Sequence, residues 1–141
     1  MLIRDCAGGV VFYENMVLMI KNDKAEWSFP KAIVHEDVEE SKVAIESVRF
    51  LAGVRAYILD EAGDTAYEFY SRSLERPVAN HIEWYVMTAD SSETELNPDY
   101  GLADAKFFPV SEALEVVTYS QERKLLSVAY QKYLELSRSD A

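Results

Sequence analysis

The chain has 141 residues, 49% of them hydrophobic and 12% aromatic, so it is long and apolar enough to form one domain spanning residues 1–141. Its formal charge of −11 excludes a general binder of nucleic-acid backbones, which needs clustered Lys and Arg side chains. Small ligands and other proteins are the expected partners. Cys6 is the only cysteine, which excludes a disulfide framework and a zinc site built on cysteines.

The N-terminus and the apolar runs indicate neither export nor a membrane span. Met1–Asp5 lacks the charged segment and the apolar core of a signal peptide. No apolar run reaches the length that crosses a bilayer. Together with the single cysteine, these features predict a cytoplasmic protein that does not engage membranes.

The first third of the chain predicts a hairpin followed by a helix. Residues 6–13 are rich in β-branched and aromatic side chains and are expected to form a strand. A tight turn at residues 14–15 leads into a second strand over 16–20. An extended segment begins at Trp27, and apolar positions at helical spacing predict a helix over 39–51.

The middle of the chain reads as strands separated by polar turns. Strands are expected over residues 54–59, 66–71 and 81–87, with a turn over 60–64 and a loop over 74–78. The last two strands are predicted to pair. In the strand over 81–87, alternation places Ile82, Trp84 and Val86 on one face and Glu83, Tyr85 and Met87 on the other.

The last third predicts a loop, a short strand and two helices. The loop covers residues 91–99 and the strand residues 104–110. Ser111 is expected to cap a short helix, and Thr118-x-x-Gln121 to form a capping box before a longer one. The inner stripe of that longer helix is predicted to comprise Leu125, Val128, Ala129, Tyr133 and Leu136. Residues 137–141 should fray.

The segment Trp27-Ser28-Phe29-Pro30-Lys31, followed by a loop, a helix and Gly53-Val54, resembles the motif region of the Nudix (MutT-like) hydrolases. The order of elements in the second half, with Val117-Thr118-Tyr119 before the last helix, is similar to the branch that cleaves diadenosine tetraphosphate. The resemblance implies an α/β fold, namely an α/β/α sandwich with a mixed sheet and a C-terminal helix.

The family's catalytic residues are largely missing from this degenerate motif. The positions that replace motif residues are Ala32 for the first Gly, Val38 for the first Glu, Glu46 for the Arg, Ser47 for the next Glu, and Phe50 and Leu51 for the metal-binding Glu pair. Spacing of i, i+3 and i+4 puts positions 47, 50 and 51 on one helical face, where three carboxylates could hold Mg²⁺. The hydroxyl of Ser47 and the hydrocarbon side chains of Phe50 and Leu51 cannot hold such an ion. No catalytic residue, metal ion or other cofactor is therefore predicted here.

For several side chains, the sequence allows either a functional role or a purely structural one. Lys31 is either a phosphate contact or a solvated loop lysine, and Tyr67 and Tyr85 either stack on a purine or pack in the core. His35 is either a metal ligand or general base, or an ordinary surface histidine. Phe50 and Leu51 either pack as core in the space where the family keeps its carboxylates, or form an exposed patch that binds a partner or a second copy.

Three functions follow from these observations. The first is a Nudix-fold protein without pyrophosphohydrolase activity that binds a nucleotide or another small phosphorylated ligand in a regulatory role. The second is an Mg²⁺-dependent hydrolase of nucleoside polyphosphates, such as diadenosine tetraphosphate, with a displaced metal site. The third is a protein-interaction module that binds no nucleotide.

Overall fold

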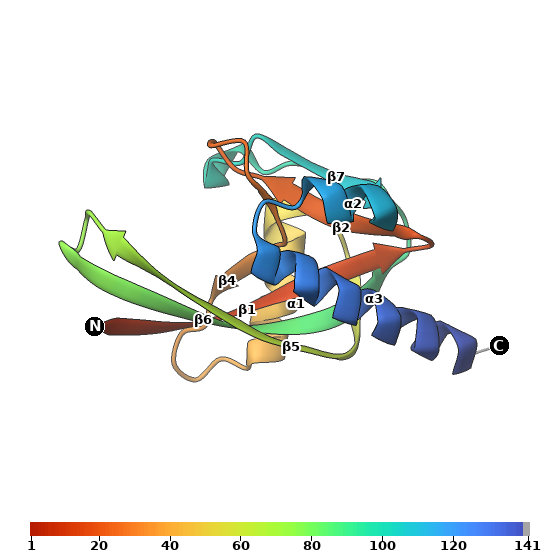
Figure 1. The fold of residues 1–141 in the computed structure, drawn as a ribbon, viewed down its shortest axis with the longest axis horizontal. Coiled ribbons are helices and arrows are strands. Elements are labelled where there is room, and N and C mark those ends of the chain that lie inside the picture. Colours follow the sequence, from red (N-terminus) through yellow and green to blue (C-terminus); the bar gives the residue numbers. More distant parts are fainter. Residues whose placement is uncertain (140–141) are drawn as a thin grey trace.

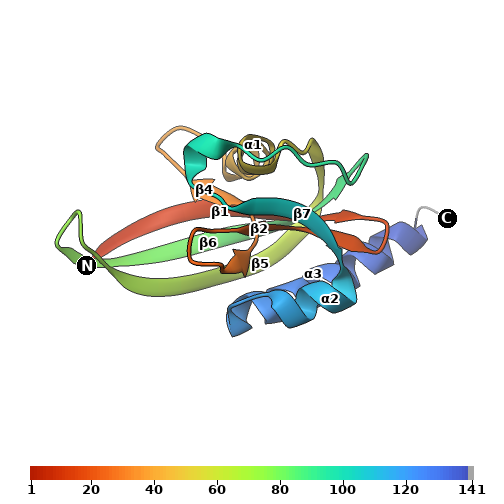
Figure 2. The same cartoon turned by 90° about the horizontal axis from the view of Figure 1, so that it is seen from above.

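The computed structural model describes residues 1–139 as one mixed sheet between two helical layers (Figures 1 and 2). Helix α1 (Glu40–Ala52) covers one face, while α2 (Val110–Val116) and α3 (Ser120–Ser139) cover the other. Strands β1 (Leu2–Tyr13) and β6 (Arg76–Ala89) pair in parallel at the centre of an otherwise antiparallel sheet. The predicted α/β/α sandwich with a mixed sheet and a C-terminal helix is therefore confirmed.

The strand order is β3-β2-β1-β6-β5, with β4 paired to β1 and β7 paired to β2. The remaining elements are β2 (Met16–Lys21), β3 (Trp27–Ser28), β4 (Lys31–Ile33), β5 (Ala56–Ser71), the 3₁₀ helix η1 (Pro98–Tyr100) and β7 (Asp104–Pro109). Within residues 1–139, no helix combines the length and the apolar character needed to cross a bilayer.

The sheet separates two hydrophobic cores, and β6 contributes to both. Ile82, Trp84 and Val86 belong to the core under α2 and α3, whereas Met87 belongs to the core under α1. Tyr85 packs against the α1 core from its edge. The predicted alternation along β6 is confirmed, because successive side chains of a strand point to opposite faces.

The predicted hairpin and first helix are also confirmed. The turn between β1 and β2 uses Glu14 at φ 54°, and α1 ends where Gly53 adopts the left-handed conformation at φ 67°. The Gly53 N–H donates to the Arg49 carbonyl at 2.9 Å, which closes the last turn. A Cβ atom on Gly53 would lie 2.8 Å from the Cβ of Glu95, so both conformation and space favour glycine there.

The predicted turn over residues 60–64 is wrong. Strand β5 runs without a break from Ala56 to Ser71, and its pairing with β6 shifts register between Ile58 and Asp60 and again between Glu61 and Gly63. The extra residues, Leu59 and Ala62, are absorbed as β-bulges in this edge strand, and Ala62 is buried in the core under α2 and α3. The loop predicted over 74–78 is likewise too long, because β6 begins at Arg76.

The predicted helix caps are wrong. Helix α2 begins at Val110 without a side-chain cap, so Ser111 does not cap it. Thr118 Oγ1 instead accepts from the Trp27 N–H at 2.8 Å. Gln121 bonds both backbone groups of Ala66, with Oε1 accepting at 2.8 Å and Nε2 donating at 3.2 Å. These two side chains hold the start of α3 to the sheet instead of capping the helix.

The inner face of α3 differs from the prediction at Val128 and at Leu126, which the predicted stripe did not include. Val128 is 48% exposed, whereas Leu125, Leu126 and Ala129 are buried against the sheet. Because Leu126 is buried beside Leu125 and Ala129, the centre of the buried stripe lies away from position 128, and Val128 faces solvent. The fraying predicted from residue 137 is not seen up to Ser139, where α3 ends, and residues 140–141 lie outside the described part.

Candidate functional site

The six positions that replace Nudix motif residues all line one pocket beside α1. Its volume is about 270 Å³. The lining residues are Ala32, Val38, Glu46, Ser47, Phe50 and Leu51 from the motif positions, joined by Lys31, Ile33, His35, Val43 and Tyr100. The fold thus brings together around one pocket the positions at which this sequence departs from the motif.

The chemistry of this pocket is largely apolar. Ser47 is buried, and its hydroxyl donates to the Ala44 carbonyl at 2.7 Å. Leu51 packs against the α1 core, while Phe50 is 51% exposed. One of the two residues therefore fills core space and the other contributes to an exposed apolar surface. Within residues 1–139, His35 belongs to no group of three metal-ligating side chains.

A larger cleft of about 510 Å³ lies on the α3 side of the sheet. Strand β5 forms one wall and the start of α3 the other. The lining residues are Asn22, Ser28, Lys31, Thr65, Tyr67, Glu68, Phe69, Tyr119, Ser120, Gln121 and Glu122. Lys31 lines both this cleft and the motif pocket, because β4 lies where the two cavities approach each other.

Two of the three predicted ligand-binding residues meet in this cleft. The Lys31 Nζ lies 5.8 Å from the centre of the Tyr67 ring. The Tyr67 hydroxyl accepts from Asn80 Nδ2 at 2.8 Å, and Asn80 Oδ1 accepts from Arg4 Nε at 3.0 Å. Because Asn80 is only 5% exposed, this chain of hydrogen bonds fixes the orientation of the aromatic ring. Tyr67 is thus held as a rigid surface on which a flat ligand can stack.

The third predicted residue, Tyr85, lies elsewhere. It is on the opposite face of the sheet from Tyr67, half-buried at the edge of the α1 core. Burial, followed by the charges of Glu40, Glu61 and Glu83, raises the pKa of its hydroxyl. Tyr67 and Tyr85 therefore cannot contact one small ligand together.

The far end of the cleft contains a pair that the sequence did not single out. The Tyr119 hydroxyl donates a short hydrogen bond to Glu26, whose other carboxylate oxygen accepts from Asn22 Nδ2 at 2.9 Å. This bond to Glu26 raises the pKa of Tyr119 to about 12. The two hydrogen bonds lower the pKa of Glu26 and keep its carboxylate ionised at the cleft rim.

Glu122 is the most unusual group in the cleft. Its Oε1 is buried and is the one buried side-chain oxygen or nitrogen in the described residues without a hydrogen-bond partner. The carboxylate accepts from the Phe29 backbone, and the charge of Lys31 favours its ionised form, but burial outweighs both and raises its pKa. Glu122 lines the cleft, and its covered Oε1 is a hydrogen-bond acceptor that the protein itself leaves unsatisfied.

Replacing Glu122 with glutamine is expected to flatten the pH dependence of stability between acidic and neutral pH. Because the pKa is raised in the native state, that state keeps a proton that the unfolded chain has lost, so the free energy of unfolding falls as pH rises through the window between the two pKa values. The variant should gain about 1 kcal/mol at neutral pH. Urea denaturation across this range measures the effect, and exposed Glu112→Gln is the control. Equal slopes in both variants would contradict it.

Sequence reasoning missed Tyr119 and Glu122, although one signal was present. The Thr118-Tyr119 segment before the last helix resembles the tetraphosphate-cleaving branch; Tyr119 belongs to this segment and Glu122 lies three residues after it. Glu122 becomes notable only when Phe29, 93 residues earlier, covers one of its oxygens, as the backbone bond between them shows. Such a contact depends on tertiary structure that no local pattern encodes.

No protein-family model matches the chain. Among solved structures, it is similar to a *Caenorhabditis elegans* Ap4A hydrolase, with a TM-score of 0.69 and 15% identity over 94% of this chain and 98% of that one. It is also similar to the *Escherichia coli* dihydroneopterin triphosphate pyrophosphohydrolase, with a TM-score of 0.71 and 13% identity over 89% and 95%.

A third similar structure is an ADP-ribose pyrophosphatase from *Streptococcus suis*, with a TM-score of 0.67 and 13% identity over 98% of this chain and 92% of that one. Identities this low carry information on the fold and not on the substrate. The near-complete coverage in both directions shows that the likeness extends over the whole arrangement of sheet and helices. The chain has the fold of the Nudix hydrolases.

Proposed function

We propose that this chain binds a nucleotide or another small phosphorylated ligand in the cleft between β5 and α3, in a regulatory role and without pyrophosphohydrolase activity. The observation that carries the proposal is the composition of the motif face. Ser47, Phe50 and Leu51 offer no carboxylate where three would be needed to hold a metal ion against a polyphosphate. The cleft on the other face retains groups that bind without catalysis.

The charges in the cleft suit a ligand with two different ends. Lys31 supplies a positive charge for a phosphate, and Tyr67 offers a fixed ring for stacking. Glu122 also lines the cleft, and a donor group on a base or sugar that reaches its covered Oε1 would satisfy that oxygen. A ligand that carries an anion at one end and a flat, hydrogen-bonding group at the other matches this set of side chains.

Thermal unfolding in EDTA with AMP, ATP or diadenosine tetraphosphate tests binding without turnover. A ligand at about a hundred times its Kd should raise the melting temperature by about 10 °C. Lys31→Ala should weaken binding about tenfold or more through loss of a charge-assisted hydrogen bond. Lys42→Ala, on exposed α1, is the control for charge alone.

The role of the Tyr67 ring is tested separately. Tyr67→Ala should weaken binding about tenfold, because stacking on an aromatic ring contributes about 1–3 kcal/mol per base. Tyr67→Phe keeps the ring and should keep most of the affinity. No stabilisation by any compound, or equal losses in the Phe and Ala variants, would argue against the cleft as the binding site. Release of phosphate with Mg²⁺ would instead support the hydrolase with a displaced metal site.

A second candidate function is a protein-interaction module, and the motif pocket favours it. Ile33, Val38, Phe50 and Tyr100 are between 39% and 55% exposed and line the same pocket. A second copy of this chain is the partner that we would test first, by measuring mass in solution against concentration for the parent and for Phe50→Ser. A monomer at all concentrations would remove this candidate.

A further inference from the structure

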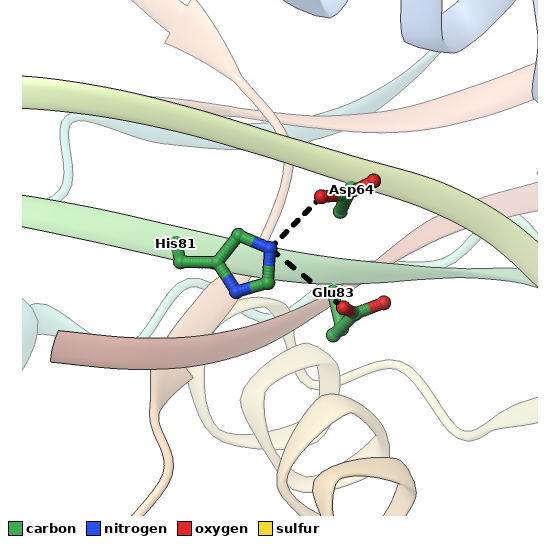
Figure 3. A group of neighbouring side chains, drawn as sticks. All are labelled: Asp64, His81 and Glu83. Atoms are coloured by element: carbon green, nitrogen blue, oxygen red, sulfur yellow. Dashed lines mark hydrogen bonds and ion pairs between the residues drawn. The ribbon is translucent and has the colours of Figure 1, made fainter.

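Three metal-ligating side chains converge on the α1 face of the β5–β6 hairpin, away from both cavities (Figure 3). His81 Nε2 lies 2.9 Å from Asp64 Oδ2 and 3.8 Å from Glu83 Oε1. All three donor atoms lie within 4.8 Å of one another. The donors bound to one tetrahedral zinc ion at about 2.1 Å lie about 3.4 Å apart, so these side chains need only small shifts to share an ion.

The sheet itself brings these residues together. His81 and Glu83 are two residues apart on β6, so their side chains point to the same face. Asp64 on β5 stands directly opposite Glu83 in the antiparallel register. Ligands on paired strands are held more precisely than ligands on loops, because the backbone hydrogen bonds fix their spacing.

A fourth residue supports the histidine from the other side. Asp5 on β1 stands opposite His81 in the parallel register, and its Oδ1 lies 3.7 Å from His81 Nδ1. A carboxylate at the second ring nitrogen orients an imidazole so that its first nitrogen faces a metal ion. The arrangement of Asp5, His81 and the two ligand carboxylates therefore has both an inner set of donors and an orienting group.

The surroundings add further negative charge. Glu40 at the start of α1 and Glu61 on β5 lie close enough to act on Glu83 electrostatically, beside Asp64. Three carboxylates, from Asp5, Asp64 and Glu83, thus act on the single imidazole, and the charges of Glu40 and Glu61 act on Glu83 beside it. A divalent cation at the centre would offset a like-charge repulsion that one histidine cannot balance.

We propose that Asp64, His81 and Glu83 form a binding site for a divalent transition-metal ion, with Zn²⁺ the preferred occupant. The imidazole nitrogen favours zinc over Mg²⁺ and Ca²⁺, which prefer oxygen donors alone. Three protein ligands leave the remaining coordination position to water, because the side chains of His81 and Glu83 are 38% and 37% exposed. The proposal is independent of ligand binding in the cleft.

Zinc chloride titrated into the EDTA-treated full chain tests the site by calorimetry. We expect one ion per chain and an increase in melting temperature with zinc concentration. His81→Ala, Asp64→Asn and Glu83→Gln should each weaken binding by at least about tenfold, and Asp5→Asn by about tenfold as an orienting group. The circular dichroism spectrum of each variant should match that of the parent chain, which checks that the variants remain folded.

The chain contains a matched control in His35→Ala, which removes its only other histidine from an exposed loop and should leave zinc binding unchanged. Co²⁺ in place of Zn²⁺ gives a second reading, because its visible absorption reports nitrogen and oxygen coordination. Zinc binding that survives His81→Ala would assign the ion to scattered surface carboxylates and overturn the proposal. Absence of binding to the parent chain would do the same.

Discussion

Trp84→Ala should lower the free energy of unfolding by about 3–5 kcal/mol, the largest loss expected from a single substitution in this chain. Trp84 is 1% exposed and packs edge-to-face on Phe29, with ring centres 6.1 Å apart. Its indole N–H donates to Thr65 Oγ1 at 2.8 Å. Gly8 lies directly against the indole, since a Cβ there would be 2.5 Å from it. Equilibrium denaturation in urea measures the loss.

Thr65→Val separates the hydrogen bond from the packing. It removes the acceptor and leaves the buried indole N–H unpaired, which should cost about 1–3 kcal/mol. Because Thr65 also lines the cleft, Trp84→Ala should weaken ligand binding there as well. A loss in Trp84→Ala no larger than that in Thr65→Val would show that the indole ring adds little to the core.

The triple variant Ser47→Glu, Phe50→Glu and Leu51→Glu should acquire affinity for Mg²⁺ at a large cost in stability. Three carboxylates at i, i+3 and i+4 would face the motif pocket together. The cost should be at least about 3 kcal/mol without metal, because Ser47 is 3% exposed and a charge there is desolvated beside two others. Mg²⁺ should raise the melting temperature of this variant.

Two controls define that experiment. Phe50→Glu alone changes an exposed position and should cost little, which isolates the effect of the buried sites. The parent chain, titrated in parallel, accounts for Mg²⁺ bound elsewhere. A folded triple variant with no more Mg²⁺ affinity than the parent would show that positions 47, 50 and 51 do not correspond to the family's metal-binding face.

The sequence predicts the fold well where local patterns and core packing agree. Apolar spacing and Gly53 define α1, and alternation along β6 assigns each of its faces correctly. It fails in β5, where Asp60 and Gly63 look like turn residues but pair with β6 in an edge strand, next to the bulges at Leu59 and Ala62. Polarity predicts solvent exposure there, and exposure alone does not distinguish a turn from an edge strand.

The candidate sites depend on contacts that the sequence does not reveal. Lys31 and Tyr67 are recognisable separately, yet their approach requires β4 and β5 to line the same cleft. His81 and Glu83 share a face by simple alternation. Asp64 joins them because the unbroken register that runs from Ser71 opposite Arg76 at the hairpin turn places it opposite Glu83, and that register is set by the assembled hairpin.

The two bonds between Gln121 and Ala66 have a consequence for how the molecule behaves at high concentration. Strand β5 ends the sheet, and an open edge offers its peptide groups as a template for a strand from another chain. The Gln121 carboxamide occupies one N–H and one C=O of that edge, as a neighbouring peptide group would. A single side chain from α3 thus occupies one position near the middle of β5 at which a strand from another chain would otherwise pair.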